Sequence, residues 1–243
     1  MSRETQNVLL ILVGGALLTI ALNGTFLRYV KPSQQPWLIA SGALMVLLAL
    51  VAIGRDIRGA GTAEAEPHDH SHGRARSSWL LLLPVLTIFL IAPPALGSDV
   101  VSRSSASPVV AGSPRHDQIV KTVFPPLPAG TPLEMRMADV ATRAAWDATN
   151  SLDGRLISVT GFAAHDRGTV YLARLVISCC AADAVPVKVR LADPNSADLP
   201  DDQWFTMTGQ IEPGSATPSN GYVPTFAVSS RHPVQAPADP YEY

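Results

Sequence analysis

Three long apolar runs lie within the first 96 residues, and they limit the possible folds of this chain more than any other feature. A helix must present roughly 17–25 apolar residues to cross about 30 Å of hydrocarbon. All three runs meet that requirement, the second by a small margin. We therefore predict an α-helical membrane anchor with three transmembrane spans, at about residues 8–29, 37–54 and 79–96.

Two other interpretations of these runs fit less well. Core helices of a soluble domain would be accompanied by amphipathic segments, and none surrounds these runs. A cleaved signal peptide would have a shorter apolar stretch and a small-residue cleavage site. Here Glu4 lies in the leading segment and no A-x-A site follows the first run. A retained membrane anchor is therefore the better interpretation.

The basic residues near the predicted spans indicate an orientation, because cytoplasmic loops carry an excess of lysine and arginine. With three spans, five arginines share the side of the N-terminus: Arg3, Arg55, Arg58, Arg74 and Arg76. The other side carries fewer basic residues: Arg28, Lys31, Arg103 and, more distantly, Arg115. We predict a multi-pass protein of the cell membrane, embedded in the lipid bilayer, with a cytoplasmic N-terminus and an extracytoplasmic C-terminal domain.

The loop between the second and third spans, residues 55–78, contains the segment EPHDHSHG. Imidazole is a common ligand for zinc and related ions, and short histidine-rich tracts can collect such metals. The candidate ligands for zinc or another transition metal are His68, Asp69, His70 and His72. Their alternate spacing does not suit a closed tetrahedral site, so binding would be weak and adaptable. A solvated loop that binds no specific ion is the competing interpretation.

The rest of the chain is a tether followed by a soluble domain. Residues 97–130 are rich in serine, proline, alanine and glycine, which is typical of a linker. The soluble domain occupies residues 131–243, where the pattern of residues 136–148 predicts one helix. Five strand-like runs follow, separated by turn segments such as HDRGT and DPNSADLPDD.

Five short strands predict a small, strongly curved β-barrel of the OB type with one flanking helix. A β-grasp or another small β-roll is the alternative fold. OB barrels often bind single-stranded nucleic acid, which requires a positive groove and stacking aromatic side chains. From residue 97 onward the chain carries 11 Lys/Arg against 15 Asp/Glu, so we expect no nucleic-acid partner.

The only two cysteines of the chain, Cys179 and Cys180, are adjacent in the turn between the second and third strand-like runs, and Asp183 follows. Adjacent cysteines can close only a strained disulfide, because their Cα atoms lie about 3.8 Å apart. Two thiolates and a carboxylate could instead bind a metal, with His165 or water as a fourth ligand. Buried structural thiols and redox exchange are the other interpretations. Because a buried face ends at Ile177, alternation predicts that Cys179 is the more buried cysteine.

The segment LARLVISCCAADAVPVKVRL, preceded by GRLISVTGF and followed by WFTMTGQI, resembles the YcgQ-like bacterial membrane proteins. The resemblance covers about residues 133–233, with a CCxxDAxP-type stretch at its centre, and agrees with the membrane spans upstream. It implies a subunit of a two-component permease whose partner is a larger polytopic permease subunit. It implies neither catalytic residues nor a particular transported substrate.

We therefore expect a non-enzymatic permease subunit whose extracytoplasmic domain contacts its partner or substrate through Cys179, Cys180 and Asp183. We assign no certain cofactor, and zinc or another transition metal is the candidate. One alternative is a metal-handling envelope protein that uses the histidine loop and the cysteine pair. Another is an envelope thiol-redox protein, although such proteins usually separate their cysteines by two residues at a helix N-terminus.

Overall fold

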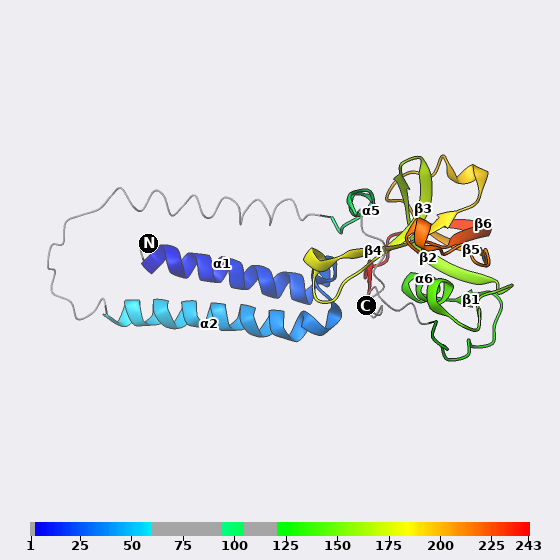
Figure 1. Ribbon diagram of the computed structural model, residues 1–243. Helices are drawn as coiled ribbons and strands as arrows, with labels where there is room; N and C mark the ends of the chain where they lie inside the picture. Colours follow the sequence, from blue (N-terminus) through cyan, green and yellow to red (C-terminus); the bar gives the residue numbers. More distant parts are fainter. Residues whose placement is uncertain (1–2, 60–93, 105–120) are drawn as a thin grey trace. The chain divides into compact units, whose positions relative to one another are not determined.

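The computed structural model describes residues 3–59, 94–104 and 121–243, and the chain divides into two compact units after Pro94. Figure 1 shows that the described part of the first unit is helical, whereas the second combines a β-sheet with short helices. The histidine loop lies almost entirely outside the described residues. So does most of the predicted third span, at residues 79–96.

The first unit contains two helices that pack against each other along their length (Figure 1). Over the described residues 3–59, its elements are α1 (Arg3–Leu22), the 3-10 helices η1 (Thr25–Arg28) and η2 (Pro32–Gln34), and α2 (Gln35–Gly59). Within the described ranges, one helical stretch, Pro32–Arg58, is long and apolar enough to cross a membrane. The apolar part of α1, Gln6–Leu22, is shorter. The three-span arrangement therefore stays a prediction.

The predicted first span, residues 8–29, does not form one continuous helix. Helix α1 ends at Leu22, and Gly24 then takes a left-handed conformation with φ of 81°. Glycine adopts this conformation without the steric cost that a Cβ would bring. The Asn23 side chain accepts a hydrogen bond from the Thr25 N–H at 2.9 Å, which satisfies a backbone donor where the chain turns. The helix therefore ends earlier than the predicted span, because Asn23 and Gly24 form a turn.

The backbones of α1 and α2 approach each other closely at Gly14 of α1 and Gly42 of α2. A Cβ added at Gly14 would lie 2.8 Å from the carbonyl oxygen of Gly42, and one added at Gly42 would lie 3.0 Å from the carbonyl oxygen of Gly14. Small residues let the backbones of membrane helices approach closely, where van der Waals packing holds them together. Gly15, by contrast, has open space at its Cβ position.

The second unit is built on a mixed sheet of seven strands in the order β1-β2-β5-β6-β4-β3-β7. The strands are β1 (Leu133–Glu134), β2 (Ile157–Asp166), β3 (Thr169–Val176), β4 (Val185–Leu191), β5 (Trp204–Ile211), β6 (Thr225–Val234) and β7 (Tyr241–Glu242). An additional pairing joins β2 to β3. Each of β2, β3, β4, β5 and β6 therefore pairs with two other members of that set.

The sequence prediction of five strands is confirmed, because each of the five runs forms a strand, β2 to β6. The predicted helix at residues 136–148 is also present, as α6 (Met137–Trp146). The 3-10 helices η3 (Ala181–Asp183), η4 (Pro194–Ser196) and η5 (Pro218–Asn220) were not predicted, and neither were β1, β7 and the helix α5 (Ser98–Arg103). The last of these lies within residues 97–130, the segment whose composition is typical of a linker.

Strands β2 and β3 bury both of their faces. One face contributes to the main core, together with α6 and strands β4 to β6. The opposite face carries Phe162, Ala173 and Leu175, which pack in a second cluster with Val101 of α5 and Tyr241 of β7. This second cluster explains why nearly all residues of β2 are buried. A strand alternates between buried and exposed residues only when one of its faces meets water, and both faces of β2 are covered.

We expect Gly14→Leu to weaken the α1–α2 pair, because the new side chain would collide with the backbone of Gly42. Overpacking of this kind costs about 1–3 kcal/mol. Thermal unfolding of the full chain in mild detergent should therefore begin at a lower temperature. Gly15→Leu is the matched control and should unfold like the wild type. Equal melting temperatures for both variants would contradict the close glycine contact.

Candidate functional site

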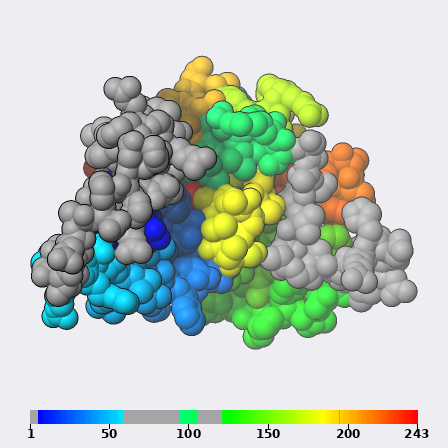
Figure 2. Space-filling view, turned by 90° about the vertical axis from the view of Figure 1, so that its left-hand side faces the viewer, coloured from blue at the N-terminus to red at the C-terminus, as the bar shows by residue number. Residues whose placement is uncertain are grey.

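The candidate site is the turn formed by residues 178–184, which joins β3 to β4. These strands are paired up to the turn, with Val176 opposite Val185. Ile177 is buried, and its N–H donates to the carbonyl oxygen of Glu242 at 3.0 Å. Figure 2 shows the yellow segment that contains this turn at the surface, beside the blue-green α5. Ala181 and Ala184 pack against the second hydrophobic cluster, so the turn is anchored on one side and open on the other.

The carboxylate of Asp183 holds the turn together through backbone hydrogen bonds. Its Oδ1 accepts from the N–H of Ser178 at 2.8 Å. Its Oδ2 accepts from the N–H of Cys179 at 2.8 Å and, at 3.4 Å, from the N–H of Cys180. The Asp183 N–H donates in return to the carbonyl oxygen of Cys180 at 3.0 Å. Aspartate side chains commonly stabilise turns in this way, so the identity of residue 183 has a local physical reason.

This arrangement brings both thiols to the same side of the turn. The two Sγ atoms lie 3.6 Å apart, and neither cysteine is in a disulfide. One ligand atom from each of Cys179, Cys180 and Asp183 lies within 4.8 Å of the others. Cys179 is exposed and Cys180 is half-buried, so the prediction that Cys179 is the more buried cysteine is wrong. The reason is that β3 ends at Val176, and strand alternation therefore stops before the pair.

The carboxylate also sets the protonation state of the turn. A hydrogen bond from the thiol to Asp183 raises the pKa of Cys179 to about 11, and Cys180 adds a smaller effect in the same direction. The same interaction, with the backbone N–H donors, lowers the pKa of Asp183 to about 2. At neutral pH the site therefore holds a neutral thiol beside an ionised carboxylate. Cysteines that attack disulfides have lowered pKa values, so Cys179 lacks this activation.

The C-terminal strand β7 fixes the start of the turn, and sequence reasoning missed this contribution. The Glu242 carboxylate accepts hydrogen bonds from the N–H groups of Met137 and Ala138, each at 2.9 Å. One of its oxygens lies 3.6 Å from Nε of Arg174 on β3. Met137 and Ala138 lie about a hundred residues from Glu242 in sequence, and Arg174 is also distant, so no local pattern could have identified Glu242.

His165 does not join the cysteines, which corrects its proposed place as a fourth ligand. Its Nδ1 lies 2.8 Å from a carboxylate oxygen of Asp201, and its Nε2 lies 3.2 Å from the carbonyl oxygen of Ala197. The hydrogen bond with Asp201 raises the pKa of His165. Both ring nitrogens are thus occupied in a structural contact. The other predicted ligands lie outside the described residues: His68, Asp69, His70 and His72.

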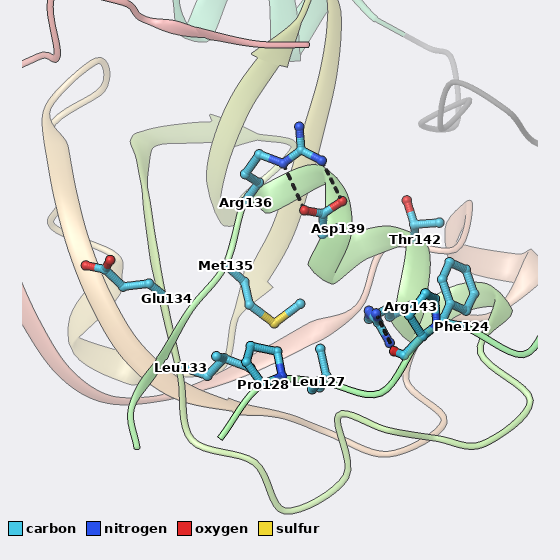
Figure 3. Close-up of a pocket in the computed structure, with 11 residues that line it drawn as sticks. Phe124, Leu127, Pro128, Leu133, Glu134, Met135, Arg136, Asp139, Thr142 and Arg143 are labelled. Carbon is cyan, nitrogen blue, oxygen red and sulfur yellow. Dashed lines mark hydrogen bonds and ion pairs between the residues drawn. The ribbon is translucent and has the colours of Figure 1, made fainter. Parts of the chain in front are cut away.

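The second unit, called the β domain from here on, also contains a pocket of about 480 Å³ beside α6 (Figure 3). Its apolar lining comes from Phe124, Pro125, Leu127, Pro128, Leu133 and Met135. Both arginines of the lining are already engaged. Arg136 forms an ion pair with Asp139 at 2.8 Å, and Arg143 donates to the carbonyl oxygen of Pro125 at 2.9 Å. Sequence reasoning missed this pocket because one of its walls belongs to the segment assigned to the linker.

The raised pKa of Cys179 leads to a prediction about its reactivity. In a Cys180→Ser background, only one thiol remains in the chain. Adding Asp183→Asn removes the negative charge beside that thiol, which should lower its pKa toward the ordinary value of 9.0. At pH 8, which is below both values, the thiolate fraction and hence the rate of alkylation by iodoacetamide should rise several-fold.

Circular dichroism of both variants provides the control for folding. Equal alkylation rates in two folded variants would show that Asp183 does not set the reactivity of Cys179.

Family models match two parts of the chain. The DUF1980 N-terminal domain matches residues 6–107, which include most of α1 and all of α2 and α5. The DUF1980 C-terminal domain matches residues 143–243, which include the cysteine turn and strands β2 to β7. Comparisons with curated proteins and with solved structures found no match. The chain therefore carries both the N-terminal and the C-terminal domain of the DUF1980 family.

Proposed function

We propose that this protein is a non-enzymatic, membrane-anchored subunit of a permease. Its β domain presents the turn of Cys179, Cys180 and Asp183 to a partner subunit or to the transported substrate. The observation that carries the proposal is the exposed thiol–carboxylate turn on a domain whose chain also contains an apolar, membrane-length helix. The resemblance to YcgQ-like proteins supplies the permease context and the expectation of a larger polytopic partner.

The surface of α2 supports the membrane part of the proposal. Many large apolar side chains of this helix are exposed, among them Trp37, Leu44, Leu47, Leu48, Leu50 and Val51. Contiguous apolar surface of this kind needs lipid or other apolar helices as its neighbour. We therefore propose three spans, including residues 79–96, with the N-terminus in the cytoplasm and the β domain outside the cell membrane.

The strand pairings support an OB-like barrel as the finer description of the β domain. Strands β2, β3, β4, β6 and β5 pair in a closed cycle, and β4 and β6 are parallel. OB folds are five-stranded barrels that use their surface and loops for binding. The net negative charge of this part of the chain makes nucleic acid an unsuitable ligand, whereas a cation or a protein surface is compatible with it.

The geometry of the cysteines favours binding over thiol-disulfide exchange. The pair precedes a 3-10 helix of three residues, Ala181–Asp183, and not the N-terminus of an α-helix. The charged carboxylate of Asp183 accepts a hydrogen bond from the N–H of Cys179 and so lies beside this cysteine. A negative charge at this position disfavours the thiolate that disulfide exchange requires. We therefore propose contact with a substrate or partner as the role of the turn.

The subunit proposal predicts a stable complex. When the tagged full chain is purified from native membranes in mild detergent, we expect one larger polytopic membrane protein to accompany it, as identified by mass spectrometry. An unrelated tagged membrane protein, prepared in the same way, is the control for contaminants. Recovery of the chain without any polytopic partner would count against a permease subunit.

The proposed orientation can be tested with the native cysteines, because the chain contains no others. The exposed Cys179 should react with a membrane-impermeant maleimide in spheroplasts without lysis. A Cys179→Ser/Cys180→Ser variant should give no signal and provides the control. Labelling that requires lysis of the spheroplasts would place the β domain in the cytoplasm and invert the proposed topology.

A further inference from the structure

We propose that Cys179, Cys180 and Asp183 bind one thiophilic transition-metal ion, and that such an ion is the substrate class of the permease. The second part of this inference rests on the proposed function, whereas the metal site itself does not. Each chain would chelate its ion through both sulfur atoms, with the carboxylate as the third protein ligand. Zinc, cadmium and copper(I) belong to this class, because thiolates favour soft and borderline metals.

The distance between the sulfur atoms suits a shared metal. Zinc–thiolate bonds are about 2.3 Å long. With bonds of that length, the observed Sγ–Sγ distance of 3.6 Å corresponds to a sulfur–metal–sulfur angle of about 100°, close to tetrahedral. Two adjacent cysteines do not generally hold their sulfur atoms in this relation, since their side chains can point to opposite sides of an extended chain. Here the turn places both sulfurs on one side before any ion is present.

Asp183 contributes in two ways. Its backbone hydrogen bonds to Cys179 and Cys180 fix the turn, so little conformational entropy remains to be lost on binding. Its carboxylate oxygen also lies within 4.8 Å of both sulfurs, close enough to become a ligand after a small movement. Hydrogen bonds that orient metal ligands are worth roughly 10–100-fold in metal affinity.

Binding exchanges protons for the metal, and no redox partner is required. A divalent ion forms two metal–sulfur bonds, each thiol loses its S–H proton to solvent, and the oxidation state of the metal is unchanged. With the carboxylate, the protein supplies three ligands. Structural zinc sites are closed by four protein ligands, whereas this site is exposed and keeps one position open. An open position lets an incoming ligand take over the ion, which is what delivery to a permease requires.

The test is a titration of the purified, reduced full chain with Cd²⁺. Cadmium bound to thiolate gives an ultraviolet charge-transfer band, and the chain has only these two cysteines. We expect the band to saturate at one cadmium per chain and to be displaced by Zn²⁺. Cys179→Ser and Cys180→Ser should each lose most of the band. Asp183→Asn should keep the band while weakening the affinity roughly 10–100-fold.

A His68→Ala/His70→Ala/His72→Ala variant is the matched control for metal collected by the histidine loop, and it should keep the full band. Circular dichroism checks that each variant is folded. The inference is overturned by the absence of a band in the folded wild type. It is equally overturned by saturation at one cadmium per two chains, or by a full band in either single serine variant.

Co-purification of the permease partner separates this inference from the proposed function. If the partner accompanies the chain but no cadmium band forms, the metal site is wrong and the subunit proposal stands. If the band forms as expected but no partner is recovered, the subunit proposal and the assignment of the ion as its substrate fail, and the metal site stands.

Discussion

The buried carboxylate of Glu242 connects the helix, the sheet and the cysteine turn of the β domain. It accepts hydrogen bonds from the first N–H groups of α6, including that of Met137, and it lies beside Arg174 of β3. A buried carboxylate without such partners is strongly destabilising, so β7 can occupy its place only when α6 and β3 are in position. The carbonyl oxygen of the same residue then receives the N–H of Ile177, which determines where β3 ends and the turn begins.

Asp183 organises the cysteine turn, residues 178–184, as Glu242 organises the domain, by accepting hydrogen bonds from backbone N–H groups. Its carboxylate satisfies backbone N–H groups of the turn and thereby holds the sulfur atoms of Cys179 and Cys180 at 3.6 Å from each other. The same negative charge disfavours the thiolate and attracts cations. Structure and chemistry therefore depend on one group. Disulfide exchange and metal binding both need a thiolate, but a bound cation, unlike a disulfide partner, supplies positive charge that offsets the carboxylate and the thiolates.

The helices of the first unit show what apolar composition alone can predict and what it cannot. Apolar length was readable from the sequence, since it requires only counting, and α2 has the length and composition of a span. The contact between Gly14 and Gly42 was not readable, because a glycine in an apolar helix can face either lipid or a neighbouring helix. The same limit applies to the end of α1. The residues Asn23 and Gly24 favour a turn, yet the apolar run continues beyond them.

Local patterns in the sequence were enough to determine five strands, helix α6 and a turn at Cys179 and Cys180, because alternation and turn residues act between near neighbours. Only the tertiary structure decided which sulfur is exposed, since that depends on where β3 ends. It also decided that α5 and β7 cover a second face of the sheet, and that Glu242 supports the turn. These features arise from contacts between residues tens to more than a hundred positions apart, and such contacts leave no periodic signal in the chain.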